Sequence, residues 1–238
     1  MSQPPDIWDF FDRIYCISLD ERHDRRQQAR EQFAAAGLLE RVEFVLVAKH
    51  PENREKGIFE SHMSCLKKGL AAGARRIMVF EDDLFFRHFD PRALREACAQ
   101  LESLGTWNAF FLGAITRGSR RTGSPSLVKI KYRCLAHAYA LNGSFAQRLV
   151  REEWNQLPFD ELLRQNQSDF FALHPMTAFQ GLSGSDNQTV IIDRLRRLFG
   201  GLPFIQKVNE FYQNHKALCL AAHLTLLGVI GLLAYKLW

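Results

Sequence analysis

The chain has 238 residues, a net charge of +5 and a pI near 9.0, and its 47% hydrophobic and 24% charged content is ordinary for a globular protein. The positive charge favours anionic partners such as nucleotides, phosphorylated glycolipids or a membrane face. No zinc-finger spacing or aromatic–basic RNA-binding motif is present, so nucleic acid is not predicted as a partner. The five cysteines are scattered without a C-x-x-C pair, which argues against a disulfide framework or a zinc site.

Strand and helix signals alternate along the first 150 residues. Strands are predicted at 13–18, 42–47, 77–80, 107–112 and 134–141, and helices at 20–36, 61–72, 90–104 and 143–153. Segment 113–126 is rich in Gly, Ser, Thr and Arg, which predicts a loop. This alternation predicts an α/β fold, a mostly parallel sheet flanked by helices, within a domain at 1–200.

The most informative segment is the apolar run 77–80, which is followed directly by Glu81, Asp82 and Asp83. The carboxyl ends of strands form the edge at which open α/β sheets bind ligands. Three adjacent carboxylates are costly to bury unless a cation lies among them, and Mn²⁺ or Mg²⁺ carrying phosphate oxygens fits carboxylate ligands. Because apolar residues also follow the acids, a metal–phosphate site and a solvated acidic turn both stay open.

Other polar residues are candidates for the same site, each with an ordinary structural alternative. Arg25 and Arg26 end the first predicted βα loop and can hold a phosphate, or form a solvated charged face. Ser61 and His62 can face the ligand, or serve as a helix N-cap and a half-buried histidine. Asp186 is a second candidate carboxylate, or part of a plain turn.

The C-terminal tail, 217–238, is almost entirely apolar and, at roughly 22 residues, is long enough to span a membrane, for which ~20 suffice. Aromatic residues at both ends resemble interfacial belts. We therefore expect a linker at 201–216 and a single-pass transmembrane helix at 217–238, with a buried core helix as the alternative. The basic residues before the tail predict that the catalytic domain faces the cytoplasm. Segment 194–199 is either a headgroup-binding stretch or a solvated linker.

Taken in order, several segments resemble glycosyltransferase family 25, the lipopolysaccharide and collagen galactosyltransferase group. The matching runs are ISLDERHDRR at 17–26, GIFESH at 57–62 with LKK at 66–68, FEDD at 80–83, HAY at 137–139, FD at 159–160, and SD at 185–186. Their order holds from about Ile14 to Asp186. Ser18 and Leu66 stand where the family usually has Asn and Trp.

The resemblance implies a GT-A-like, Rossmann-like fold and a UDP-sugar donor, most simply UDP-galactose. It further implies transfer of the hexose to a saccharide acceptor such as lipopolysaccharide or another lipid-linked oligosaccharide. The implied roles are metal binding for Glu81 and Asp83, nucleotide contacts for Arg25, Arg26, Ser61, His62 and Asp82, and acceptor deprotonation for Asp160 or Asp186. A metal-dependent phosphohydrolase and a non-catalytic, tail-anchored binding or scaffold protein remain as alternatives. The linkage and the oligomeric state are left open.

Overall fold

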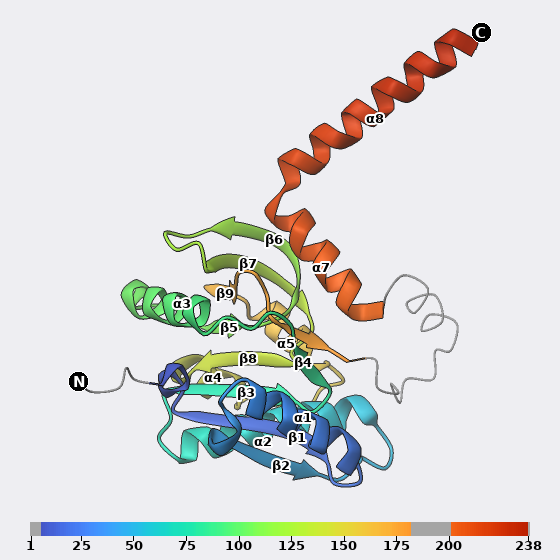
Figure 1. Ribbon diagram of the computed structural model, residues 1–238. Coiled ribbons are helices and arrows are strands. Elements are labelled where there is room, and N and C mark those ends of the chain that lie inside the picture. The colour runs from blue at the N-terminus through green and yellow to red at the C-terminus, as the bar shows by residue number, and fades with distance from the viewer. Residues whose placement is uncertain (1–5, 182–200, 238) are drawn as a thin grey trace.

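The computed structural model describes residues 6–181 and 201–237, which form a large mixed sheet with helices on both faces and a small second sheet (Figure 1). The strands are β1 (Arg13–Leu19), β2 (Val42–Val47), β3 (Arg76–Glu81), β4 (Leu84–Phe86), β5 (Ala109–Phe111), β6 (Ile115–Arg121), β7 (Leu127–Cys134), β8 (Ala138–Asn142), β9 (Phe170–Leu173) and β10 (Ala178–Gln180). The helices are η1 (Ile7–Phe10), α1 (His23–Ala35), η2 (Leu39–Arg41), α2 (Arg54–Ala71), α3 (Pro91–Leu104), α4 (Gly143–Leu149), α5 (Phe159–Gln165), α7 (Gly201–Asn214) and α8 (Lys216–Leu237).

The eight-stranded sheet has the order β2-β1-β3-β8-β5-β9-β7-β6, and β4 pairs with β10 in the second sheet. Parallel pairs join β1 with β2, β1 with β3, and β5 with β9. Antiparallel β8 lies between β3 and β5, and β7 and β6 extend the far edge as a hairpin. The predicted α/β architecture with helices around one large sheet is confirmed, although its antiparallel strands were not predicted.

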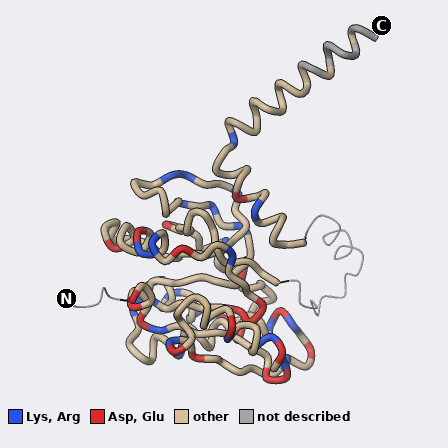
Figure 2. Tube along the Cα trace, in the orientation of Figure 1, with Lys and Arg blue, Asp and Glu red and all other residues tan. Residues whose placement is uncertain are grey.

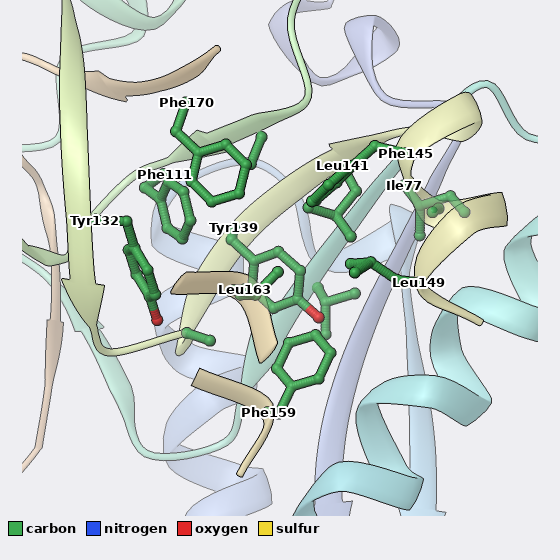
Figure 3. Packing of buried hydrophobic residues seen from close by; sticks show 14 of the residues in the cluster. Ile77, Phe111, Tyr132, Tyr139, Leu141, Phe145, Leu149, Phe159, Leu163 and Phe170 are labelled. Atoms are coloured by element: carbon green, nitrogen blue, oxygen red, sulfur yellow. The ribbon is translucent and has the colours of Figure 1, made fainter. Parts of the chain in front are cut away.

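Two apolar layers lie on opposite faces of the large sheet. Side chains of α2, α4 and α5 pack on one face, and those of α1, α3 and η1 pack on the other. Figure 3 shows part of the first layer, where the rings of Phe111, Tyr132, Tyr139, Phe159 and Phe170 gather over the strands. Burial of these large aromatic side chains, each contributing roughly 1.5–3 kcal/mol, fixes the sheet on which the polar edge is built.

Helix ends are set by local capping chemistry. The Asp90 carboxylate accepts the Arg92 amide at 2.8 Å, Pro91 fills the first helical position, and Gly105 ends α3 with φ +67°. Helix α2 begins at Arg54 rather than at the predicted residue 61, because the side chain of Asn53 caps it through the Lys56 amide. Ser61 is consequently inside this helix and is not its N-cap.

The polar segment 113–126 was predicted as a loop, but its first part forms the edge strand β6. The predicted strand 134–141 is replaced by two strands, β7 and β8. Strand β6 contacts α7 through Thr116, whose amide donates to Asn209 Oδ1 and whose carbonyl accepts from Asn209 Nδ2, both at 2.9 Å. Because most residues of this strand are polar, it shows no hydrophobic period in the sequence.

The C-terminal region is helical where a linker was predicted. Residues 201–214 form α7, which packs on β6 and β10, and the apolar tail forms α8. Within the described parts of the chain, no helix combines the length and apolarity required to cross a membrane. His223 and Thr225 lie within the apolar run of α8, and each bonds a carbonyl of the preceding turn, that of Cys219 at 2.6 Å and that of Ala221 at 3.0 Å. The transmembrane helix at 217–238 stays a prediction.

Candidate functional site

The acidic run lies where the parallel strands β1, β2 and β3 end. Glu81 is the last residue of β3, and Asp82 and Asp83 form the turn to β4. The backbone amide of Glu81 donates to the His137 carbonyl at 2.9 Å, and that of Asp82 donates to the Ile17 carbonyl at 3.1 Å. The carboxylates are therefore fixed between β1 and β8 at the sheet edge, as the strand pattern predicts.

Asp82 is held by one residue of β1 and one residue of α1. The buried Ser18 hydroxyl donates to Asp82 Oδ2 at 2.7 Å, and the Arg25 guanidinium lies 3.8 Å from Asp82 Oδ1. Burial raises the pKa of Asp82, while the Ser18 hydrogen bond and the Arg25 charge act to lower it. Ser18 thus has a defined role, since its hydroxyl contacts the buried carboxylate directly.

Glu81 and Asp83 converge on one amide group. Gln180 Nε2, at the end of β10, lies 3.4 Å from Glu81 Oε2 and 3.2 Å from Asp83 Oδ2. The other oxygen of Asp83, Oδ1, is buried and has no hydrogen-bond partner among the described residues. Burial and the neighbouring Glu81 charge raise the pKa of Asp83 to about 7, despite Arg25 Nη1 at 3.8 Å from its Oδ2. A cation at this point would satisfy the unpartnered oxygen.

A buried polar chain supports Glu81 from the α2 side. His62 Nε2 lies 3.3 Å from Glu81 Oε1, and His62 Nδ1 lies 3.0 Å from the Tyr139 hydroxyl. The imidazole stacks on Phe159 with ring centroids 4.2 Å apart and an interplanar angle of 2°. Burial acts to raise the pKa of Glu81, but the His62 hydrogen bond and nearby positive charge lower it overall. Glu81 is therefore held as an oriented, ionised carboxylate.

The acidic run faces a cavity of about 160 Å³ between α1, α2 and the ends of β1 and β2. Arg25, Ser61, His62 and the three acids line it, together with apolar side chains of Leu19, Val47 and Ile58 and the basic groups of Lys49, His50 and Arg54. A slot with an apolar wall, several cations and a carboxylate edge can hold an apolar ring that carries a polyphosphate.

A second cavity, of about 510 Å³, lies on the other side of Asp83. Its walls are Gln28, Glu31 and Gln32 of α1, the segment Asp83–Phe85 with Arg87, and Gly181, Pro203, Phe204 and Lys207. Asp83 lines both cavities, so a group bound in one lies next to a group bound in the other. The sequence analysis missed this cavity because it depends on α7, a segment that was predicted to be a linker.

The structure brings most, but not all, of the predicted site residues together. Arg25, Ser61, His62, Glu81, Asp82 and Asp83 all line the smaller cavity. The guanidinium of Arg26 instead donates to Ser18 Oγ at 3.3 Å and to the Leu19 carbonyl at 3.1 Å, and so braces the first loop.

Of the two predicted base candidates, only Asp160 is among the described residues, and it is held away from both cavities. Asp160 lines neither cavity, because its carboxylate accepts the Tyr132 hydroxyl and the Leu135 amide inside the domain. Asp186 lies outside the described residues. Gln180, which bridges the two outer acids, belongs to the matched sequence region but had no predicted role.

The acidic site fits a divalent cation of a particular kind. Among residues 6–181 and 201–237, no group of three or more His, Cys, Asp or Glu side chains is arranged to hold a metal. Mg²⁺-type sites often take only one or two protein carboxylates and complete their coordination with phosphate oxygens and water. Glu81 and Asp83, with the unpartnered Oδ1, match that smaller requirement. The fitting ligand is consequently a metal–phosphate complex and not a bare ion.

No protein-family model matches the chain. The mannose-1-phosphate geranyltransferase of Thermus thermophilus is similar in structure, with 14% identity, a TM-score of 0.44, and 67% of this chain and 72% of that chain covered. A197 from STIV has 10% identity and a TM-score of 0.44 over 71% and 85% of the two chains. A glycosyltransferase involved in glycosylation of the major capsid of PBCV-1 has 9% identity and a TM-score of 0.40 over 67% and 80%. Likenesses at this level carry no argument about activity.

Proposed function

We propose that the protein is a glycosyltransferase that moves a hexosyl group from a UDP-sugar to a saccharide acceptor with the help of Mn²⁺ or Mg²⁺. One observation carries this proposal: a buried carboxylate run at the end of β3 separates a narrow cavity with basic and apolar walls from a wider one. Two substrates that must meet at a charged centre need this arrangement. The resemblance to family 25 supports the same reaction and stays a prediction.

The narrow cavity is proposed to bind the donor. Its apolar side chains would pack on the base, and Arg25 would give charge-assisted hydrogen bonds to the diphosphate. Glu81 and Asp83 would hold the metal, which when bound neutralises the charge that develops on the leaving diphosphate. His62 and Gln180 keep the two carboxylates in place, and Ser18 does so for Asp82.

The wide cavity is proposed to bind the acceptor. Phe85 and Phe204 offer aromatic surface for the C–H face of a sugar, and Gln28, Gln32 and Glu31 offer groups that can bond hydroxyls. Arg87 and Lys207 would attract an acceptor that carries phosphate or carboxylate groups. Because the cavity meets the donor cavity at Asp83, an acceptor hydroxyl bound there would lie next to the sugar carbon of the donor.

Donor binding can be tested by thermal unfolding of the full chain. UDP with Mn²⁺ should raise the melting temperature, since a ligand that binds only the native state stabilises it. Chelator should remove the gain, and GDP and CMP should give much less. Arg25→Ala should weaken UDP binding roughly 10- to 100-fold, as expected for a lost charge-assisted contact of about 1.5–3 kcal/mol. The control Arg92→Ala, on the exposed part of α3, should bind UDP normally.

Turnover separates the proposal from its alternatives. Incubation with UDP-hexoses and Mn²⁺ should release UDP slowly with water as acceptor, and faster with a suitable saccharide. Release of inorganic phosphate would favour a phosphohydrolase. UDP binding with no turnover across donor and saccharide panels would favour a binding or scaffold protein. Equal stabilisation by GDP or CMP, or no nucleotide binding at all, would contradict the proposal.

A further inference from the structure

Helix α7 packs with its polar face inward. Gln206, Asn209, Glu210 and Asn214 all point to the domain: Gln206 Nε2 donates to the Ala178 carbonyl at 2.8 Å, and Glu210 accepts the Met176 amide at 2.7 Å. Ser119 Oγ donates to Asn214 Oδ1 at 2.6 Å, beside the paired bonds of Asn209 to Thr116. The helix is therefore attached to β6 and β10 mainly by hydrogen bonds.

The opposite face of α7 is apolar and lies in solvent. Phe204, Val208, Phe211 and Tyr212 follow helical spacing and are 52%, 50%, 54% and 48% exposed. The exposed apolar surface continues along α8, which projects away from the domain in Figure 1, through Leu218, Leu220 and Leu224. A contiguous exposed surface of this kind is unusual for a monomer and marks an interaction site.

The hairpin β6–β7, against which α7 packs, is strongly basic. Six cationic residues lie between Ile115 and Cys134 without a single acid: Arg117, Arg120, Arg121, Lys129, Lys131 and Arg133. Lys129 pairs with Asp169, and the other five are exposed. Figure 2 shows the hairpin with basic segments and no acidic ones, whereas the two signs are mixed around α1 and α2.

We propose that the exposed face of α7, its continuation on α8 and the basic β6–β7 hairpin together form a docking surface for an anionic lipid membrane. Large apolar side chains enter the headgroup boundary, while arginine and lysine side chains attract the lipid charge. Lys207 lies on the exposed side of α7 and Lys216 at the start of α8, so positive charge also accompanies the apolar residues.

The chemistry of the surface favours lipid over other occupants. In a two-fold dimer formed through this surface, the basic hairpins of the two copies would lie close to each other. Repulsion between their like charges would oppose such a dimer. A single-stranded nucleic acid would use cations and stacking aromatic rings, but the apolar surface includes aliphatic Val208 and continues through leucines of α8, which have no stacking face. A lipid boundary accommodates aliphatic, aromatic and basic side chains together.

The test is co-sedimentation of the full chain with vesicles of phosphatidylcholine alone and with about 30% phosphatidylglycerol, an anionic lipid. Stronger binding to the anionic vesicles, reduced by salt, is expected. The triple variant Arg120→Gln, Arg121→Gln and Lys131→Gln should weaken this binding about 100-fold, given the contribution of each basic residue near an anionic surface. The matched control Lys67→Gln, Arg92→Gln and Arg95→Gln makes the same charge change on α2 and α3 and should bind normally.

A second pair of variants tests the apolar part. Phe211→Ser with Tyr212→Ser should release the protein from anionic vesicles, whereas Leu46→Ser with Leu104→Ser, which removes exposed apolar residues elsewhere, should not. Equal binding to neutral and anionic vesicles, or equal loss in both triple variants, would overturn the proposal. So would self-association in sedimentation velocity that Phe211→Ser abolishes without any vesicle binding, or tight binding of single-stranded DNA in its place.

Discussion

The two charged regions of this protein are built in opposite ways. At the end of β3, three acids are drawn into the domain, where Arg25, Ser18, His62 and Gln180 approach their carboxylate oxygens. On the β6–β7 hairpin, the cations point into solvent, and among the described residues Lys129 has a defined ion pair. Buried charge demands a partner of definite shape, whereas exposed charge selects a partner by sign alone. The first region is therefore suited to recognition and the second to attraction.

The largest effect is expected from a substitution in the acidic region. Asp83→Asn keeps the side-chain volume but removes a proposed metal ligand, so transfer should fall about 10²–10³-fold, equivalent to about 3–4 kcal/mol of barrier. Asp20→Asn, an exposed carboxylate of the first loop, is the matched control and should retain activity. Rates are measured with saturating Mn²⁺. Unchanged turnover in Asp83→Asn would remove the metal assignment.

A smaller effect is expected where α7 is attached. Asn209→Ala leaves both backbone groups of Thr116 without their side-chain partner, which should lower the free energy of unfolding by about 1–3 kcal/mol. Gln213→Ala, on the same helix, should cost much less, because its side-chain oxygen has no hydrogen-bond partner. Urea unfolding compares the two. Equal costs would mean that α7 is held by its apolar contacts instead.

The pH dependence of stability tests the burial of Asp83. Its folded-state pKa of about 7 lies above its ordinary value of 3.8, so the protonated carboxyl favours the folded state at low pH. The stabilisation of the folded state by the protonated Asp83 carboxyl is complete below about pH 4 and is lost as pH rises through about 7. In metal-free buffer, Asp83→Asn should thus be more stable than the parent at about pH 8, by about 1–3 kcal/mol, and similar at about pH 4. A variant that is less stable than the parent in the alkaline buffer would contradict this.

The smallest effect is expected from a substitution in the first strand, β1. Ser18→Ala removes the hydroxyl bond to buried Asp82, at an expected cost of about 1 kcal/mol in unfolding free energy. UDP affinity should change little, because Asp82 is still approached by Arg25. Ser18→Asn offers an amide donor in place of the hydroxyl. Loss of UDP binding in Ser18→Ala would show that Asp82 contacts the nucleotide directly.

The sequence predicted the features that depend on local pattern. The strands at 13–18, 42–47 and 77–80 and the helix at 90–104 follow hydrophobic period and capping residues, and the structure confirms them within a few residues. The site residues on these elements were found for the same reason. Because strand ends converge in a parallel arrangement, Arg25 and the acidic run could be assigned to one edge before the fold was known.

The missed features depend on contacts between distant residues. Strand β6 has mostly polar residues, so no hydrophobic period predicts it, and α7, more than 80 residues later in the chain, supplies hydrogen bonds to its Thr116. Gly113 is needed because a Cβ there would lie 1.9 Å from the Ala178 carbonyl oxygen. The residues next to Gly113 in the sequence give no sign of this close contact. The segment of α7 was predicted to be a linker because Gly201 and Pro203 mark a change of composition there. In the structure it is a helix whose apolar residues face outward, the reverse of the usual amphipathic pattern.

Strand β10, three residues long, links α7 to the acidic run. Its first residue, Ala178, accepts the bond from Gln206 of α7, and its last, Gln180, has its amide within hydrogen-bond reach of the carboxylates of Glu81 and Asp83. One short strand therefore positions both the C-terminal helix and the amide that contacts the two acids.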